Sequence, residues 1–450
     1  MNKTTSVLVL VFLALTLSRG YAQTLTLDSC LALARYNNAD IRTSLLEIER
    51  AHEVKRQVFT KFFPQMRVSA LGYYASDPLI RFGINDVQSN DMRDILQSLY
   101  ELVVESGSDV RNEVSLMKNG SSAMALVAQP LFAGGRIVTG NRLARLGVEA
   151  AELQAEVQMR DVLEAVESSF YLVVGLQEKE ATVSAALALI DSLDRTVQSA
   201  LANGLVTKAD ALQVQLKRNE IMAQQQQLAS GMRLSKRLLC SQIGIAFSDS
   251  LVFVAPELMD LPPLQYSFAA SGDSLRPEVR LLELSVEAEQ LNRRMTLGEA
   301  LPQLTLIGSA FYGNMIKQDP AANAVVLLSL SVPISAWWET SHRLHQHDIR
   351  IQEAAIKQEH LNRMMSIEEE KAYSDMVDAY MLIRSDSSAL DIAAENYRIA
   401  NLNYTAGAST LSDVLQAHAL LLQSQNAITD RRTSYIMARR RLADLQSKQF

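Results

Sequence analysis

The sequence predicts a mainly helical protein that contains four β-strands and uses one structural plan twice. Three observations support this fold class. Only 10 of 450 residues are proline and 48% are apolar, a composition that favours long helices around a large core. Two helical stretches, 136–203 and 339–405, contain no proline. Segments with strand-like composition precede each of these stretches, and the punctuating residues recur at fixed offsets.

The repeat appears in two registers. Segments 38–42 and 63–66 match segments 276–280 and 301–304 at an offset of 238. From Pro130 and Pro333 onward the offset is 203. The difference between the offsets, 238 and 203, places 35 additional residues in the first copy, between Tyr74 and Pro130. We therefore expect a first repeat at 23–243, a linker at 244–273 and a second repeat at 274–450.

A turn pattern occurs at the same place in both copies, at residues 203–213 and 406–416. The matching positions are Gly204 and Gly407, Thr207 and Thr410, Asp210 and Asp413, Leu212 and Leu415, and Gln213 and Gln416. Glycine ends a helix in the left-handed conformation, threonine caps the next helix, and aspartate in the first turn is favoured by the helix dipole. Each segment therefore predicts a tight turn between two helices.

Each copy is expected to run helix, strand, loop, strand, very long helix, turn, helix. In the first copy the expected helices are 27–62, 136–203 and 207–243, and the strands are 65–75 and 122–132. In the second copy the expected strands are 303–312 and 323–334, and the later helices are 339–405 and 410–448. The weak period-two alternation of the strands is typical of a sheet with lipid on one face and a lumen on the other.

Two further segments connect these elements. The 35 additional residues lie within 76–121, where Ile95 to Val103 predict a small amphipathic helix. The linker at 244–273 contains three prolines and the apolar run 251–254, and we expect it to pack outside the helices as a belt.

Residues 1–22 predict a secretory signal peptide. Lys3 supplies the charged start, residues 7–17 are apolar, and Gly20 and Ala22 are the small residues before a cleavage site at Gln23. A membrane anchor is the alternative, although the apolar stretch is short for a span. The net charge of −7 without a basic patch gives no indication of nucleic-acid binding. Cys30 and Cys240 lie in helix-like apolar contexts, which favours two buried thiols over a disulfide.

Taken together, these features resemble the TolC-like outer-membrane efflux family (outer-membrane factors). The resemblance covers the chain from Leu25 onward. Its motifs are LTLDSCLALA at 25–34, NNADI at 37–41, the two Pro-Gln strand starts, QPLFAGGR at 129–136, and both turns.

This resemblance implies a homotrimer in which four strands per subunit close a twelve-stranded transmembrane β-barrel, continued by a long periplasmic α-helical barrel. Closure also has a physical reason, because the edges of an open sheet cannot be satisfied by hydrocarbon. The implied location is the outer membrane, in contact with its lipid. The implied partners are a periplasmic adaptor (membrane fusion protein) and an inner-membrane pump of the RND or ABC type.

In this family, polar links and rings of acidic side chains close the periplasmic end. Residue-by-residue alignment places the ring acid nearest the turn at Asp413, the linking tyrosine at Tyr404 and its carboxylate partner at Asp210. Two positions depart from the family, since Gln416 replaces the second ring acid and Ser409 replaces the linking arginine. We therefore expect a closing hydrogen bond between Tyr404 and Asp210. As an alternative or additional role, the two aspartates are helix N-terminal acids.

The turn residues are also expected to contact the adaptor. They are Gly204, Leu205, Val206, Thr207, Gly407, Ala408 and Thr410.

Other residue groups give weaker indications of function. His342, His345 and His347 lack additional residues at metal-ligand spacing, apart from Glu339 one turn earlier, so a solvated helix face is favoured over a metal site. Aromatic residues at strand ends predict either interfacial anchoring or ordinary packing; they are Tyr73, Tyr74, Phe311, Tyr312, Trp337 and Trp338. Motifs of phosphate-binding loops and nucleophilic hydrolases are missing, so we expect no enzyme, cofactor or metal centre.

The predicted function is the outer-membrane exit duct of a tripartite efflux or type I secretion system. The duct would be a passive channel that opens at its periplasmic helical turns. The alternative is a periplasmic coiled-coil scaffold protein without a barrel.

Overall fold

The computed structural model describes residues 24–77, 80–83, 94–95, 97, 113–116, 119–255, 276–314 and 321–446. The helices in this part of the chain are α2 (Leu27–Asn37), α3 (Ala39–Phe59), α5 (Arg136–Ala202), α6 (Lys208–Gln242), α7 (Pro277–Glu299), α8 (Ala336–Thr405) and α9 (Leu411–Gln446). The strands are β1 (Thr24–Leu25), β2 (Gln65–Tyr74), β3 (Ile80–Gly83), β4 (Glu113–Leu116), β5 (Asn119–Ala133), β6 (Val252–Phe253), β7 (Gln303–Gly313) and β8 (Ala321–Ser331). The predicted signal peptide, most of the predicted helix at 95–103, and the linker after Ala255 lie outside the described residues.

The chain divides into two compact units, and each takes residues from both predicted repeats. The helical unit comprises Met1–Arg50, Glu149–Leu284 and Ala354–Phe450. The sheet unit comprises Ala51–Val148 and Ser285–Glu353. The two compact units therefore do not correspond to the two predicted repeats, and the boundaries of the repeats stay a prediction.

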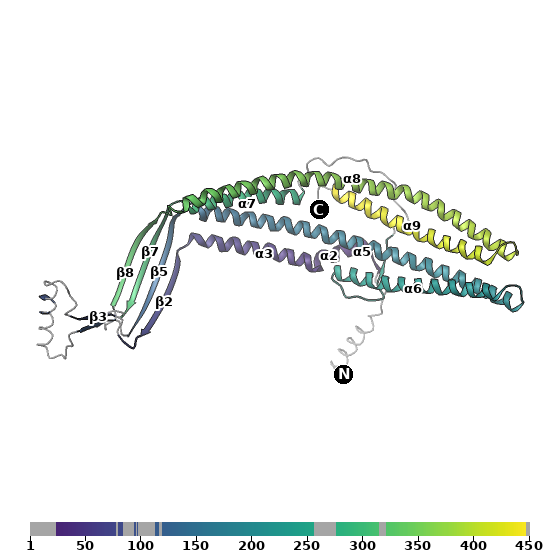
Figure 1. The fold of residues 1–450 in the computed structure, drawn as a ribbon, viewed down its shortest axis with the longest axis horizontal. Coiled ribbons are helices and arrows are strands. Elements are labelled where there is room, and N and C mark those ends of the chain that lie inside the picture. Colours follow the sequence, from purple (N-terminus) through teal and green to yellow (C-terminus); the bar gives the residue numbers. More distant parts are fainter. Residues whose placement is uncertain are drawn as a thin grey trace, which may run out of the picture. The chain divides into compact units, whose positions relative to one another are not determined.

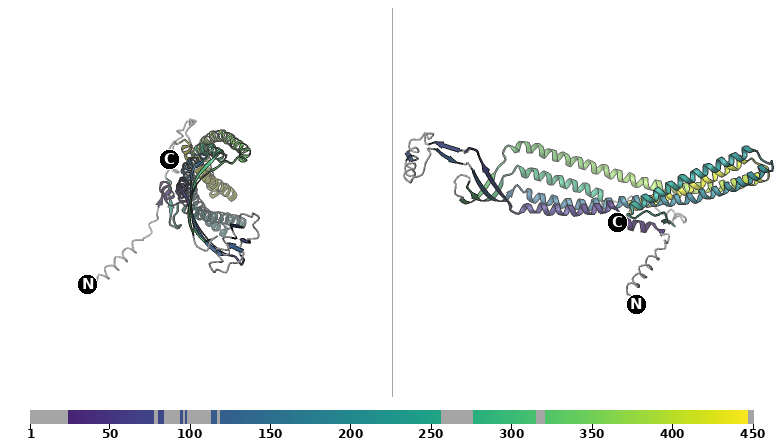
Figure 2. Two further views of the ribbon diagram at one scale, coloured as in Figure 1. Left: turned by 90° about the vertical axis from the view of Figure 1, so that its left-hand side faces the viewer. Right: turned by 90° about the horizontal axis from the view of Figure 1, so that it is seen from below.

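The sheet unit is built on an antiparallel sheet with the strand order β2-β5-β7-β8. Figures 1 and 2 show these four strands side by side. All four predicted strands occur, with small shifts at their ends. The strand β8 ends at Ser331 rather than at residue 334, because Pro333 has no N–H to donate to a neighbouring strand and α8 begins at Ala336. A register irregularity between Pro130 and Phe132 occurs at the proline inside β5.

A close backbone approach fixes the start of α5 against α7 in this unit. Gly134 has a φ of 60°, and a Cβ atom there would lie 2.1 Å from the Gly298 carbonyl oxygen. Any other residue at 134 would collide with this carbonyl group, so glycine is required on steric grounds. The pair of glycines lets the two helices leave the sheet as direct neighbours.

The helical unit contains two hairpins, α5 with α6 and α8 with α9, each of which ends in a turn (Figure 1). Side chains from all four helices form one apolar core near the turns, which includes Val197, Val214 and Val414. A second core lies further from the turns, where Phe170 packs edge to face on Phe253 with ring centroids 6.1 Å apart. The apolar stripe Leu163, Val166, Phe170 and Val173 on α5 is buried in this second core.

The predicted first helix, 27–62, is interrupted at Asn38. The Asn38 side-chain oxygen accepts hydrogen bonds from the backbone N–H groups of Asp40, at 2.8 Å, and of Ile41, at 3.2 Å. Its amide group donates to the Gln242 carbonyl oxygen at 2.7 Å. Asn38 thus caps α3 and also holds the end of α6, so the break depends on a contact between segments far apart in sequence.

The linker packs against the helices over the part that the structure describes. The strand β6 pairs in parallel with β1, with Leu25 opposite Phe253. Leu251 and Phe253 are buried in the second core. This placement agrees with the expected belt as far as Ala255.

Both cysteines are buried and carry free thiols, as predicted. Burial, with a smaller contribution from Cys240, raises the pKa of the Cys30 thiol to about 12. None of the described helices is long and apolar enough to cross a membrane.

Candidate functional site: the two helical turns

The two turns have the same local geometry. Gly204 and Gly407 lie in the left-handed region, with φ of 70° and 74°. In the first turn, the N–H of Leu205 donates to the carbonyl oxygen of Ala200 at 2.9 Å; in the second, the N–H of Ala408 donates to that of Asn403 at 2.7 Å. These bonds from the sixth residue back to the first define a Schellman ending, which satisfies the last carbonyl groups of α5 and α8. The predicted glycine endings are therefore confirmed.

The helix that leaves each turn begins with a reciprocal cap. The Asp210 carboxylate accepts from the N–H and hydroxyl of Thr207, at 2.9 Å and 2.7 Å, and the Asp210 N–H donates to the Thr207 hydroxyl at 3.2 Å. Thr410 and Asp413 make the same three bonds, at 3.0 Å, 2.7 Å and 3.3 Å. The hydrogen bonds from the threonines lower the pKa of both aspartates. This arrangement is the capping role that was expected for the two acids.

Tyr404, in the last turn of α8, lies close to the first hairpin. Burial first, and then the negative charge of Asp210, raise the pKa of the Tyr404 hydroxyl. The structure thus brings the two predicted gate residues within electrostatic range. Among the described residues, the hydrogen bonds that the Asp210 carboxylate accepts come from Thr207. The closing bond between Tyr404 and Asp210 stays a prediction.

The two positions that depart from the family lie at the second turn. The Ser409 hydroxyl donates to the Ala400 carbonyl oxygen at 3.2 Å, so the side chain is bonded within its own hairpin. Gln416 and Asp413 are exposed on α9. Their predicted roles at the gate stay predictions.

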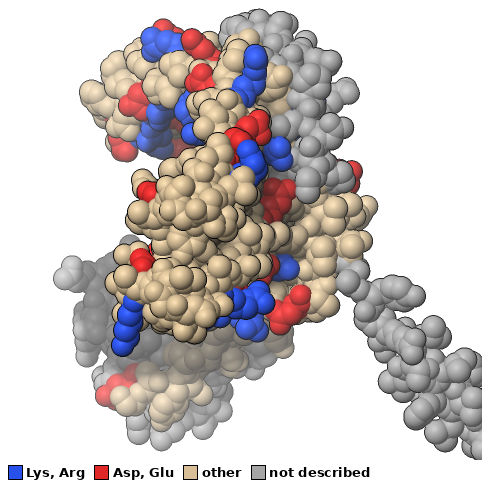
Figure 3. All heavy atoms as spheres, turned by 90° about the vertical axis from the view of Figure 1, so that its right-hand side faces the viewer, with Lys and Arg blue, Asp and Glu red and all other residues tan. Residues whose placement is uncertain are grey.

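The face that carries the turns has a mixed charge pattern. Figure 3 views this face, on which acidic and basic side chains lie interspersed among uncharged ones. Some of them are paired, such as Arg218 with Asp191 at 2.6 Å. Leu205 stands at the first turn with 77% of its surface exposed, and Val206 beside it is half-buried. The turn therefore presents an apolar side chain to solvent.

A buried histidine beneath the turns was missed by sequence reasoning. His418 on α9 is 2% exposed, and its ring lies 5.5 Å from that of Tyr397 on α8. Its Nδ1 atom has no hydrogen-bond partner among the described residues. Burial, and then the charge of Lys217, lower the pKa of His418. The apolar positions Leu411, Val414 and Leu421 share its helix face and were the available signal.

The sheet has two chemically different faces. Directly opposite residues in antiparallel strands point to the same side, so the register defines each face. One face carries apolar rows across the four strands, among them Val68, Ala125, Ala310 and Ala324, and Met66, Val127, Gly308 and Val326. The other face carries mixed rows, among them Arg67, Leu126, Ser309 and Val325, and Ser69, Met124, Phe311 and Asn323. The side chains of Val68 and Val326 are largely exposed, so the described residues leave the apolar face uncovered.

The histidine cluster at the start of α8 divides into one contact residue and two exposed residues. His347 lies between α8 and α7, with Nδ1 2.7 Å from the Glu289 carboxylate and Nε2 2.9 Å from the Thr296 hydroxyl. This position corrects the expected solvated face, because only His342 and His345 are exposed. The described residues contain no group of three or more acidic, histidine or cysteine side chains that could hold a metal ion.

The aromatic residues at the strand ends are largely exposed. Trp338 and Tyr74 are exposed, and Trp337 donates from its indole N–H to the Ala300 carbonyl oxygen at 2.8 Å. Trp337 therefore has one polar contact and an exposed ring, as is typical of interfacial tryptophan.

Residues 274–446 match the sequence model of the outer membrane efflux protein family. The matched residues cover the second predicted repeat almost completely and amount to less than half of the chain. None of the curated proteins compared with this chain matches it.

Solved structures share the fold of this chain over most of its length. The channel CusC is 14% identical, with a TM-score of 0.74, and the similarity covers 94% of this chain and 92% of CusC. The CmeC outer membrane channel of Campylobacter jejuni is 15% identical, with a TM-score of 0.73 and coverage of 94% and 86%. The outer membrane protein VceC of Vibrio cholerae is 15% identical, with a TM-score of 0.70 and coverage of 93% and 95%. At such low identity these similarities establish the fold.

Proposed function

We propose that this chain is the outer-membrane exit duct of a tripartite efflux or type I secretion system. Three copies close a twelve-stranded barrel in the outer membrane, and their helices continue as an α-helical barrel through the periplasm. The duct is passive and opens at the helical turns. A periplasmic adaptor contacts the turns, and an inner-membrane pump of the RND or ABC type supplies energy.

The division of the sheet into an apolar face and a mixed face carries this proposal. A strand that separates lipid from a water-filled lumen alternates between apolar and polar side chains. The strands have 10, 15, 11 and 11 residues, and a tilted strand needs about 9 to 11 to cross the hydrocarbon. The uncovered apolar face is therefore long enough to match a bilayer.

The edges of the sheet support assembly from several copies. The strands β2 and β8 are the first and last in the sheet order, so each has one neighbour among the described strands. An unpaired edge in hydrocarbon leaves N–H and C=O groups without partners, at a cost of several kcal/mol for each group. Pairing β8 of one subunit with β2 of the next removes both edges. Because the plan is duplicated within the chain, each of the two repeats contributes an equal share of the wall and of the turns.

The turns support a gate and a docking place at the periplasmic end. Asp210, Asp413 and Tyr404 lie within or beside them, and Leu205 is exposed for contact with an adaptor. Gly204, Val206, Thr207, Gly407, Ala408 and Thr410 complete this contact surface. Because α5 and α8 end in the same Schellman geometry, both hairpins present similar surfaces to the adaptor.

The test combines mass and conductance. We expect the purified protein in detergent to have the mass of three copies, by light scattering or native mass spectrometry, and to conduct ions in planar bilayers. A stable single copy that does not conduct would contradict the proposal and favour the alternative of a periplasmic coiled-coil scaffold.

A further inference from the structure

A charged cavity lies between α5 and α7 in the sheet unit. Its volume is about 420 Å³. Its lining residues are Arg142, Arg145 and Leu146 of α5 and Glu287, Gln290, Leu291 and Arg294 of α7. The spacing of three, four and seven residues puts each set on one helix face, so the two faces oppose each other.

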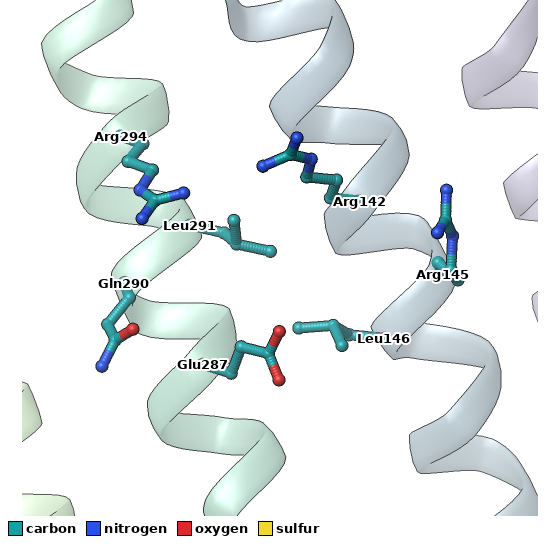
Figure 4. Close-up of a pocket in the computed structure, with 7 residues that line it drawn as sticks. All are labelled: Arg142, Arg145, Leu146, Glu287, Gln290, Leu291 and Arg294. Carbon is teal, nitrogen blue, oxygen red and sulfur yellow. The ribbon is translucent and has the colours of Figure 1, made fainter.

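The side chains of the cavity converge from both helices. In Figure 4, Arg142 and Arg294 extend into the space between α5 and α7, above Leu291. Glu287 and Leu146 point toward each other at a lower level, and Arg145 lies at the outer margin on α5. The cavity thus has two guanidinium groups at one end, a carboxylate at the other and leucines between them.

None of these four charged side chains has an ion pair or hydrogen bond within the described residues. Neighbouring arginines in the same unit are paired. Arg293, next to Arg294, donates to Asp348 at 2.8 Å, and Arg343 donates to Glu299 at 2.8 Å. The chain has 50 acidic and 43 basic side chains, so carboxylates are not scarce. The cavity thus brings together arginines that have no partner among the described residues, and all three of them are exposed, as is Arg237 on α6, which also has none.

The donor set fits a phosphate group. A guanidinium group is always charged, has donors only and binds phosphate oxygens in a bidentate manner. Gln290 also lines the cavity, and its amide group points away from α5 (Figure 4). The charged side chains of the cavity are exposed, so a ligand can reach them from solvent.

The Glu287 carboxylate, at the opposite end of the cavity from Arg142 and Arg294, restricts which chemical groups of a ligand can lie beside it. A carboxylate accepts hydrogen bonds and repels a second negative charge, so it suits a hydroxyl or ammonium group of the ligand. The cavity lies in the usual size range for small-molecule sites, which exceeds a single inorganic ion. The ligand class is therefore a phosphate ester whose far end carries a hydroxyl or ammonium group.

We propose that the α5–α7 cavity binds such a phosphate ester, with Arg142 and Arg294 holding the phosphate and Glu287 holding the hydroxyl or ammonium end. Arg142 is roughly 9 Å along α5 from its first residue, and Arg294 is roughly 8 Å from the last residue of α7. Both helix ends adjoin strands of the sheet. If the sheet spans the membrane, a step that rests on the proposed function, this distance corresponds to the layer of lipid headgroups. The phosphate ester then comes from a lipid headgroup or from a soluble molecule in the same compartment.

The experiment measures binding to the full-length protein, purified in detergent without added lipid, by isothermal titration calorimetry. The probes are glycerol 3-phosphate, inorganic phosphate and short-chain phosphatidylglycerol. We expect saturable binding of glycerol 3-phosphate and about a tenfold or greater loss of affinity in Arg142→Gln/Arg294→Gln. Arg237→Gln is the matched control, since Arg237 on α6 is exposed and also lacks a partner among the described residues. This control should bind as the unchanged protein does.

A second variant tests the orientation of the ligand. We expect Glu287→Gln to lower the affinity for glycerol 3-phosphate, because the acceptor for its hydroxyl group is weakened. The same variant should raise the affinity for inorganic phosphate, because a negative charge is lost. Tighter binding of phosphatidylglycerol than of glycerol 3-phosphate identifies a lipid source, and the reverse order identifies a soluble source. No saturable binding of any probe, or equal affinity in the double variant, overturns the proposal.

The two proposals can fail separately. If the protein conducts ions but binds no phosphate ester, the proposed duct stands and the proposed binding site is wrong. If it binds the phosphate ester but does not conduct, the proposed site stands and the proposed duct is wrong.

Discussion

The carboxylate of Asp210 accepts two hydrogen bonds from Thr207, at 2.9 Å from the backbone N–H and 2.7 Å from the hydroxyl. The same residue raises the pKa of Tyr404, which lies near the end of α8 in the other hairpin. One carboxylate thus stabilises the start of α6 and acts electrostatically on α8. A substitution of Asp210 affects both, and separating the two effects requires a second variant.

We predict that Asp210→Asn and Tyr404→Phe both increase single-channel conductance or leak in planar bilayers. Each change weakens the predicted closing contact between the hairpins. The side-chain amide introduced at position 210 still accepts a hydrogen bond from the Thr207 N–H, so most of the cap is kept. Thr207→Ala is the control, because it removes cap bonds and keeps the charge of Asp210. Unchanged conductance in both gate variants would remove the gate assignment.

The caps themselves give a prediction on local stability and pH. We expect Thr207→Ala and Thr410→Ala each to cost about 1 kcal/mol and to speed amide hydrogen exchange at the starts of α6 and α9. Lowered carboxyl pKa values in the folded state add stability above the unfolded value of about 4, and this stability is lost as pH falls through the folded values. Protection at residues 208–210 and 411–413 should therefore decrease below about pH 4. Equal exchange in variants and parent would contradict the role of the caps.

Substitutions at two neighbouring residues test whether the two faces of the sheet meet different environments. Val326, at the middle of β8, belongs to the apolar face, and Val325 belongs to the mixed face opposite Ser309. We predict that Val326→Arg reduces insertion into vesicles, because arginine in the bilayer midplane costs about 2 to 4 kcal/mol. Val325→Arg is the control and should insert nearly as the parent does. Similar losses in both variants would show that the register does not separate lipid from lumen.

The contact of His347 with α7 predicts a difference between two neighbouring histidines. Burial alone raises the pKa of Glu289, and hydrogen bonds led by that from His347 outweigh it and lower the pKa. We expect His347→Ala to reduce stability by about 1 to 3 kcal/mol, because Glu289 and Thr296 lose a partner. Thermal unfolding measures the effect, and His345→Ala, an exposed position on the same helix, is the control. Equal unfolding temperatures would contradict a structural role for His347.

The buried thiols predict low reactivity. The thiolate is the reactive species, and with a pKa of about 12 the Cys30 thiol is almost fully protonated at pH 8. We expect neither Cys30 nor Cys240 to react with a thiol reagent in the folded protein, and both to react after denaturation. Rapid labelling of the folded protein at pH 8 would show that the α2–α6 contact opens.

Local signals in the sequence were sufficient for the turns and strands. The turn residues Gly204 and Thr207 act through bonds within six positions of themselves, so their pattern predicts the geometry directly. The strand starts were set by Pro64 and Pro302, and prolines act locally as well. These features do not depend on contacts with distant parts of the chain.

Features that depend on tertiary contacts were missed. The break at Asn38 needs the Gln242 carbonyl, which is 204 residues away. The position of His347 depends on Glu289 and Thr296 of another helix. Arg142 of α5 and Arg294 of α7 likewise line one cavity only because these two helices are neighbours. The spacing of apolar residues along one helix carries no information on which polar residues of different helices meet.

The two open edges of the sheet have a consequence for biogenesis. If the sheet spans the membrane as proposed, a solitary copy cannot enter hydrocarbon while β2 and β8 each have one neighbour among the described strands, so it stays in the aqueous compartment until other copies arrive. If three copies meet before entry, the yield of inserted pores rises with a high power of the secretion rate. Such cells would switch sharply between few and many pores over a narrow range of expression, and slow secretion would leave the chains to proteases.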